Sequence, residues 1–234
     1  MNLPTQQNAC VFGGNGGLGS AIATYLSSQG CQTWSTSRQS SDNPNTIQVD
    51  PSIPNGLSSL SSLSNLDIIV WSQGVNTNDT ALTVNPETYQ HVMNINVDFV
   101  VQTLQHLWEI GKINQGARLC IISSIWQEIS RPNKFSYTVS KAAIAGLVKS
   151  AAIDFAPYGV LVNAVLPGVV DTAMTRAMLS EQQKNNVLRE TPLNRLTQPE
   201  DIAFAVWSLV SPYNRAITGQ SIIVDGGFSI MKSI

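Results

Sequence analysis

The chain has 234 residues, 43% of them hydrophobic, and a formal net charge of −2. This length and composition suit one large domain that needs neither disulfides nor a metal, and we predict a single domain over residues 1–234. The sequence contains no basic stripe for nucleic acid and no apolar run near the roughly 18 residues that a membrane helix needs.

Residues 13–19 contain five glycines, between an apolar run at 9–12 and a helical pattern that ends at Gly30. A strand that enters a tight turn and then a helix leaves backbone N–H groups free at the helix N-terminus, where the helix dipole also favours a phosphate. Glycines let the phosphates approach bare backbone. The pattern therefore predicts a dinucleotide site, and because no lysine follows the glycines it disfavours an ATPase-type phosphate loop.

The residues after the second predicted strand, 32–36, bear on the choice between the two nicotinamide dinucleotides. An acidic side chain here would bind the ribose 2′-hydroxyl of NAD(H), whereas an arginine would suit the 2′-phosphate of NADP(H). The chain has Arg38, its only basic residue among the first 111, and no acidic residue before Asp42. We expect NADP(H) in preference to NAD(H); a plain exposed arginine is the alternative.

Apolar runs and helical patterns alternate along the rest of the chain. Later strands are expected at 46–49, 66–71, 118–123, 160–165 and 221–224, and the plainest helices at 86–110, 135–156 and 199–210. Leucines recur every third residue near the serine-rich stretch 52–65, which indicates a short surface helix. The predicted fold class is α/β, a Rossmann-type doubly wound parallel sheet with helices on both faces, which binds ligands beyond the carboxyl ends of its strands.

Two residues of the predicted helix 135–156 suggest catalysis. Tyr137 and Lys141 are four positions apart, which puts both side chains on one helix face. Ser124 follows the strand 118–123, at the edge of the sheet where a ligand is expected. Each feature is common by itself: Ser124 would also serve as a helix cap or strand-end hydroxyl, and the other two as a surface pair.

Together these features resemble the short-chain dehydrogenase/reductase family. The glycine pattern T-G-x-x-x-G-x-G is matched by residues 12–19 at every position but the first, the strand-ending Ile-Ser-Ser by 122–124, and Tyr-x-x-x-Lys by 137–141. Pro-Gly-x-x-x-Thr is matched by 167–172, and the ending of the last strand by 224–227. Asn96 matches the helix asparagine of the family's catalytic tetrad.

The chemistry expected is hydride transfer between nicotinamide and a small carbonyl or alcohol, with Tyr137 as general acid or base. Working as a base near pH 7 requires the tyrosine pKa to fall by roughly three units from its usual value near 10, and a neighbouring ammonium would supply part of that. Lys141 would lower this pKa and bind the nicotinamide ribose, Ser124 would polarise the substrate oxygen, and Asn96 would hold a water leading to Lys141.

The resemblance also implies a set of cofactor-binding residues. Asp50 would approach the adenine, although it would equally cap the turn at Pro51. The expected set is Gly13, Asn15, Gly17, Leu18, Gly19, Arg38, Asp50, Gly74, Tyr137, Lys141, Val170 and Thr172.

The sequence departs from the family pattern beside the glycines. Phe12 replaces the usual threonine, and Trp71-Ser72-Gln73-Gly74 stands where the family commonly has Asn-Asn-Ala-Gly. Either Ser72 or Gln73 substitutes for the lost asparagines or that wall of the cofactor site is rearranged, and Gln73 would also be able to reach into the active site.

Residues 172–191 form the expected substrate lid, with Met174 and Met178 on its apolar stripe. Two rival functions remain: a non-catalytic dinucleotide sensor, and a sugar-nucleotide epimerase or dehydratase, whose members usually carry a longer carboxyl-terminal domain.

The resemblance implies a homotetramer or dimer, assembled through the helices that begin at Pro86 and Phe135 and through residues 199–228. The three cysteines and two histidines lack metal-ligand spacing, so no metal is expected. Without a targeting signal or a membrane segment, we expect a cytoplasmic protein.

Overall fold

The computed structural model describes residues 6–231, except for the side chains of Met174 and Met178, which lie outside the described part. This part of the chain forms a parallel seven-stranded sheet in the order β3-β2-β1-β4-β5-β6-β7. The strands are β1 (Asn8–Phe12), β2 (Gln32–Ser37), β3 (Thr46–Gln48), β4 (Leu66–Trp71), β5 (Ile113–Ile122), β6 (Leu161–Pro167) and β7 (Ser221–Val224). All seven predicted strands and the predicted fold class are confirmed.

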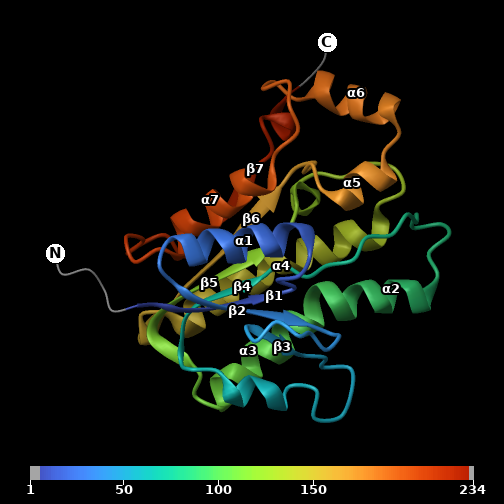
Figure 1. The fold of residues 1–234 in the computed structure, drawn as a ribbon. Coiled ribbons are helices and arrows are strands. Elements are labelled where there is room, and N and C mark those ends of the chain that lie inside the picture. Colours follow the sequence, from blue (N-terminus) through green and yellow to red (C-terminus); the bar gives the residue numbers. More distant parts are fainter. Residues whose placement is uncertain (1–5, 232–234) are drawn as a thin grey trace.

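Helices cover both faces of the sheet, as Figure 1 shows. On one face, α1 (Gly17–Ser28) packs beside α7 (Pro199–Val210) over apolar side chains of β1, β4 and β5. On the other face, α3 (Phe99–Glu109) and α4 (Phe135–Phe155) bury the opposite side chains of the same strands. The short helix predicted within 52–65 is a 3₁₀ turn at Ser58–Ser62, where Leu60 is buried.

The predicted helix 86–110 is interrupted. It consists of α2 (Pro86–Met93), a π turn at Asn94–Asp98, and α3. Asn85 caps α2 by accepting a hydrogen bond from the Thr88 backbone N–H at 3.0 Å. The hydrophobic spacing tolerates one extra residue, so periodicity does not reveal the π turn.

β5 begins five residues before the predicted start at 118, because Ile113 already pairs with Leu66 ahead of a register shift. Polar residues and Gly116, whose φ is +76°, occupy this early part of the strand and hide it from an apolar pattern.

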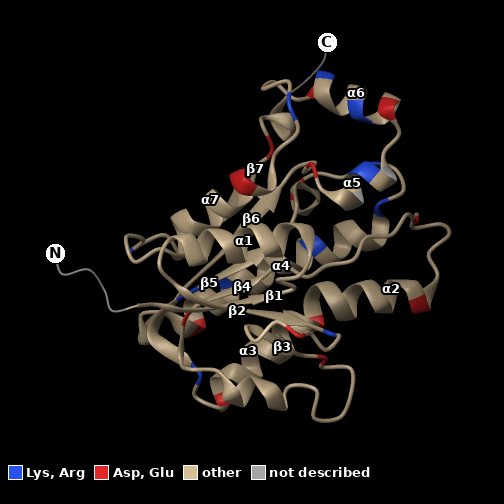
Figure 2. Ribbon diagram, viewed as in Figure 1, with Lys and Arg blue, Asp and Glu red and all other residues tan. Residues whose placement is uncertain are grey.

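The strand order reverses between β1 and β4, and this switch point is where doubly wound sheets bind ligands. The carboxyl ends of all strands lie at one edge of the sheet, and α5 (Ala173–Met178) and α6 (Glu181–Glu190) extend beyond it (Figure 1). Figure 2 shows several charged residues along α5 and α6. Between residues 6 and 231, no helix has the length and apolar character needed to cross a membrane.

Candidate active site

The glycine turn after β1 is closely packed against its surroundings. Gly13 has φ +74°, and a side chain there would lie 2.8 Å from the Gln73 backbone nitrogen. Side chains at Gly14 and Gly19 would collide with Ser35 and with the Gly13 carbonyl, respectively. No described side chain caps the N-terminus of α1, so its first N–H groups are available to an external acceptor. The turn therefore fits a phosphate group.

The other residues expected around this turn have different surroundings. Thr172 lies against Gly17, with its Cβ 3.4 Å from the position of an added Cβ, and caps α5 through the Thr175 backbone N–H. Asn15 is exposed in the turn, whereas Leu18 packs against the core beneath α1. Val170 is buried and bridges to Thr197. Of these, Thr172 and Asn15 have the positions best suited to touching a ligand.

Arg38 and Asp50 follow β2 and β3 at the same edge of the sheet. The Arg38 side chain is exposed, and its carbonyl accepts a hydrogen bond from Gln48. Asp50 accepts hydrogen bonds from the Ser52 hydroxyl and backbone N–H, at 2.5 and 3.0 Å. These bonds, aided by nearby Arg38, hold the pKa of the Asp50 carboxyl below its usual value. Asp50 therefore caps the turn at Pro51, the alternative role open from the sequence.

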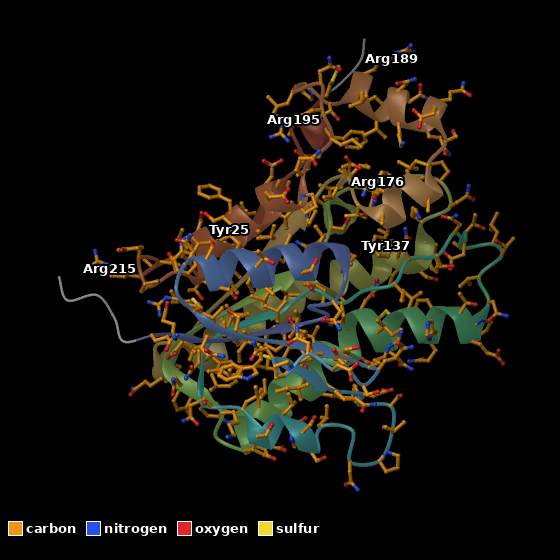
Figure 3. All side chains as sticks on the ribbon, in the orientation of Figure 1. Tyr25, Tyr137, Arg176, Arg189, Arg195 and Arg215 are labelled. Carbon is orange, nitrogen blue, oxygen red and sulfur yellow. The ribbon has the colours of Figure 1, made fainter. Side chains whose placement is uncertain are left out.

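Tyr137 and Lys141 lie on α4 and meet Ser124 at the end of β5. Tyr137 occupies the first turn of this 21-residue helix. In Figure 3 it lies below α5, the helix that carries the labelled Arg176. The Lys141 Nζ lies 5.7 Å from the centre of the tyrosine ring. It donates a hydrogen bond to the carbonyl of Ile122 at 3.0 Å. The structure thus brings all three predicted side chains together.

Burial controls the protonation of this cluster. It raises the pKa of Tyr137 to about 12, although a hydrogen bond with the Ser124 side chain acts in the opposite direction. Burial also lowers the pKa of Lys141 to about 8. The lowering of the tyrosine pKa expected from the neighbouring ammonium is therefore outweighed by desolvation. At neutral pH the phenol keeps its proton, which suits the acid role in carbonyl reduction, whereas the lowered pKa that the base role requires is not found.

Ser124 also serves as a helix cap, the alternative role that the sequence left open. Its Oγ accepts a hydrogen bond from the Trp126 backbone N–H at 3.4 Å and so caps a short 3₁₀ turn at Ile125–Gln127. This long hydrogen bond fixes the hydroxyl only weakly, and the same oxygen contacts Tyr137.

Asn96 lies in the π turn, and its buried side chain joins two segments of the site. Its Oδ1 accepts from the Val75 N–H at 2.8 Å, and its Nδ2 donates to the Val75 carbonyl at 3.0 Å and to the Ser140 hydroxyl at 2.9 Å. Its amide is therefore engaged by protein groups, and the water predicted from the sequence would have to bind elsewhere on this residue. Gly74 is adjacent: a Cβ there would lie 3.4 Å from Asn96 Oδ1 and 3.7 Å from Lys141 Nζ.

Sequence reasoning missed Lys134, which is only 3% exposed. Its Nζ donates to the side-chain oxygens of Asn76 and Asn78, both at 2.8 Å, and lies 5.9 Å from the centre of the Tyr137 ring. Burial and repulsion from Arg131 lower the pKa of Lys134 to about 8. Its place three residues before Tyr137 was a usable signal that it lies near the site. Its asparagine partners, however, are more than fifty residues away in sequence.

Ser72 replaces one lost asparagine at the end of β4. Its backbone N–H and its hydroxyl both donate to the carbonyl of Phe12, at 2.9 and 3.0 Å. It therefore ties β4 to β1 directly below the glycine turn. Within residues 6–231, no group of three or more histidine, cysteine or acidic side chains is arranged to hold a metal.

Comparisons with known proteins identify the family of this chain. A family model described as enoyl-(acyl carrier protein) reductase matches residues 58–229. A 3-oxoacyl-[acyl-carrier-protein] reductase of Rickettsia typhi is 32% identical, covering 95% of this chain and 97% of the relative. An L-rhamnose 1-dehydrogenase (NADP(+)) of Thermoplasma acidophilum is 28% identical, covering 96% of each chain.

Among solved structures, a short chain dehydrogenase family protein of Francisella tularensis superposes with a TM-score of 0.88 at 28% identity, over 97% of this chain and 100% of that one. The segment matched by the family model contains β4 to β7 and the Tyr137 cluster but not the glycine turn. The relatives cover at least 95% of the chain. The chain therefore belongs to the short-chain dehydrogenase/reductase family of oxidoreductases.

Proposed function

We propose that this protein is an NADP(H)-dependent oxidoreductase that transfers hydride between nicotinamide and a small carbonyl or alcohol, with Tyr137 as general acid or base. The observation that supports this most directly is the convergence of Tyr137, Ser124 and Lys141 at the end of β5, beside Gly74 and near the glycine turn.

A bound dinucleotide would supply or accept the hydride. In carbonyl reduction, the protonated Tyr137 gives its proton to the substrate oxygen while Ser124 orients and polarises that oxygen. The phenolate left behind lies in the first turn of α4, where the helix dipole favours a negative charge, and close to the Lys141 ammonium. Lys141 would also bind the nicotinamide ribose.

The preference for NADP(H) rests on Arg38. It is exposed beyond β2, at the ligand edge of the sheet, with the glycine turn following the neighbouring strand β1. One relative carries NADP(+) in its name. Calorimetric titration of the purified protein with NADPH and NADH tests this preference, and tighter binding of NADH would contradict it.

The names of the relatives suggest which substrates to try. They include 3-oxoacyl-[acyl-carrier-protein] reductase, acetoacetyl-CoA reductase and L-rhamnose 1-dehydrogenase. We propose that the substrate is a small carbonyl or alcohol compound and that residues 172–191 cover it as a lid. NADPH oxidation with 3-oxoacyl thioesters and NADP⁺ reduction with aldoses would sample both groups.

Replacement of Tyr137 by phenylalanine tests the catalytic role. The loss of a general acid should reduce turnover by roughly 10²–10⁴-fold, while the affinity for NADPH changes little. Full activity of Tyr137→Phe would refute the role. Tight NADPH binding without oxidation of NADPH across a broad carbonyl panel would favour a sensor, and conversion of a sugar nucleotide without net redox change would favour an epimerase.

We also propose that the protein assembles as a homotetramer or dimer. Apolar side chains are exposed on the outer surface of α3 and α4, as at Trp108 and Ile153, and around α7 and β7, as at Phe204 and Ile223. Exposed apolar clusters of this kind favour association. Light scattering coupled to size-exclusion chromatography would measure the assembly, and a monomer at micromolar concentration would contradict it.

A further inference from the structure

Gln73 occupies a position between the glycine turn and the Tyr137 cluster. It is the second residue after β4, and its backbone nitrogen and Cβ lie 2.8 and 3.1 Å from where a Cβ on Gly13 would stand. On its other side, Gly74 adjoins Asn96 and Lys141. Because β1 and β4 flank the switch point of the sheet, Gln73 lies where a dinucleotide held by the turn would pass toward Lys141.

The side-chain amide of Gln73 has an unmet hydrogen-bonding need. Its Oε1 is buried and accepts no hydrogen bond from any residue that the structure describes. A buried carbonyl oxygen that has lost water without gaining a donor is unfavourable. The residue as a whole is only partly buried, and its neighbour Gly74 is exposed, so rotation of the amide would present this oxygen to a ligand bound at this edge of the sheet.

The chemistry of the dinucleotide limits which of its groups is able to bind Gln73 Oε1. Phosphate oxygens at neutral pH only accept hydrogen bonds, whereas ribose hydroxyls donate them. A carbonyl oxygen such as Oε1 needs a donor. We propose that Gln73 binds the dinucleotide by accepting a hydrogen bond from a ribose hydroxyl that NADPH and NADH share. This inference rests on the proposed cofactor binding and adds a contact that the family's usual alanine at this position is unable to make.

Two substitutions separate the hydrogen bond from the volume of the side chain. Gln73→Ala introduces the residue common in the family, and Gln73→Met keeps the length without the amide. Loss of one neutral hydrogen bond should weaken binding of NADPH by about 5- to 10-fold in both variants, and binding of NADH by the same factor. Isothermal titration calorimetry measures both affinities without any substrate, and circular dichroism verifies folding.

Gln127→Ala is the matched control. Gln127 also has a buried, unpartnered Oε1 within the described residues, but its Nε2 donates to the hydroxyl of Ser221, the first residue of the edge strand β7. Its removal should leave both dinucleotide affinities unchanged.

The outcomes are distinct. Equal or tighter binding by the Gln73 variants would overturn the inference, and so would a loss confined to one of the two dinucleotides. If the wild-type protein bound neither NADPH nor NADH, the proposed function itself would fail. If only Gln73→Ala misfolded, the dinucleotide affinities of Gln73→Met alone would test the inference.

Discussion

Phe12 and Trp71 stack with nearly parallel rings across β1 and β4, with ring centroids 5.6 Å apart and ring planes inclined by only 3°. They are direct partners in the strand register. Both are departures from the family's sequence pattern, which commonly has threonine and asparagine at these two positions. An aromatic pair therefore replaces a polar pair at one point of the sheet, and Ser72 takes over the polar link to the Phe12 carbonyl.

The buried indole is held by one polar contact, from Trp71 Nε1 to the Thr103 hydroxyl at 2.8 Å. Thr103→Val keeps the shape but leaves the indole N–H without an acceptor, which should lower the free energy of unfolding by about 1–3 kcal/mol. Urea denaturation measures this. Thr24→Val, at an exposed position of α1, should change it by less than about 0.5 kcal/mol. Equal effects of the two substitutions would contradict this account of the indole.

Gly19 and Gly146 offer a paired test of the glycine turn. Alanine at Gly19 would push its Cβ into the Gly13 carbonyl, whereas at Gly146 no neighbouring atom lies within 4 Å. Gly19→Ala should cost about 1–3 kcal/mol of stability and also weaken NADPH binding. Gly146→Ala, inside α4, should stabilise the protein by about 0.5–1 kcal/mol. Unfolding curves and calorimetry test both, and wild-type NADPH affinity in Gly19→Ala would argue against a phosphate site here.

Arg38→Ala should weaken the binding of NADPH and not that of NADH. A lost hydrogen bond to a charged group is worth about 1.5–3 kcal/mol, so NADPH affinity should fall by roughly 10- to 100-fold while NADH affinity stays nearly constant. Arg215→Ala is the control, because Figure 3 shows Arg215 far from Tyr137, in the connection between α7 and β7. A parallel loss of affinity for both dinucleotides in Arg38→Ala would point to a disturbed fold instead of a lost phosphate contact.

Lys134 should make stability depend on pH in a defined range. Its pKa is about 8 in the folded protein, compared with an ordinary value of 10.5. Between these pH values the unfolded chain binds more protons at this residue than the folded protein does, so this lysine destabilises the fold below pH 8 and the penalty fades as the pH rises to 10.5. The free energy of unfolding of wild type minus that of Lys134→Met should therefore increase across this range.

The subtraction removes the contributions of the other buried groups, including Cys10 and Cys120, whose pKa values burial raises to about 12. Urea titrations at several pH values provide the measurement. A difference that stays constant or falls with pH would show that the buried ammonium is not destabilised.

Spacing along the chain was enough to predict the seven strands, the fold class and the place of Ser124 at the sheet edge, because parallel strands bring their carboxyl ends to one edge. That Tyr137 and Lys141 meet Ser124 there was predicted only with the help of the family resemblance. The direction of the Tyr137 pKa shift was not predictable, since it depends on how deeply the folded chain buries the ring. The contacts of Lys134 with Asn76 and Asn78 likewise depend on a long irregular connection that leaves no periodic pattern. The stacking of Phe12 on Trp71 could not be predicted without knowing the register in which β1 and β4 pair.

The position of α5 and α6 along the chain has an evolutionary consequence. Both helices lie in the connection between β6 and α7, and neither contributes a strand to the sheet. Insertions, deletions or wholesale exchange within 173–190 would therefore leave the sheet and its edge intact. Under the lid role proposed for residues 172–191, descendants of this chain would be free to acquire new specificities through that segment while inheriting the same sheet edge.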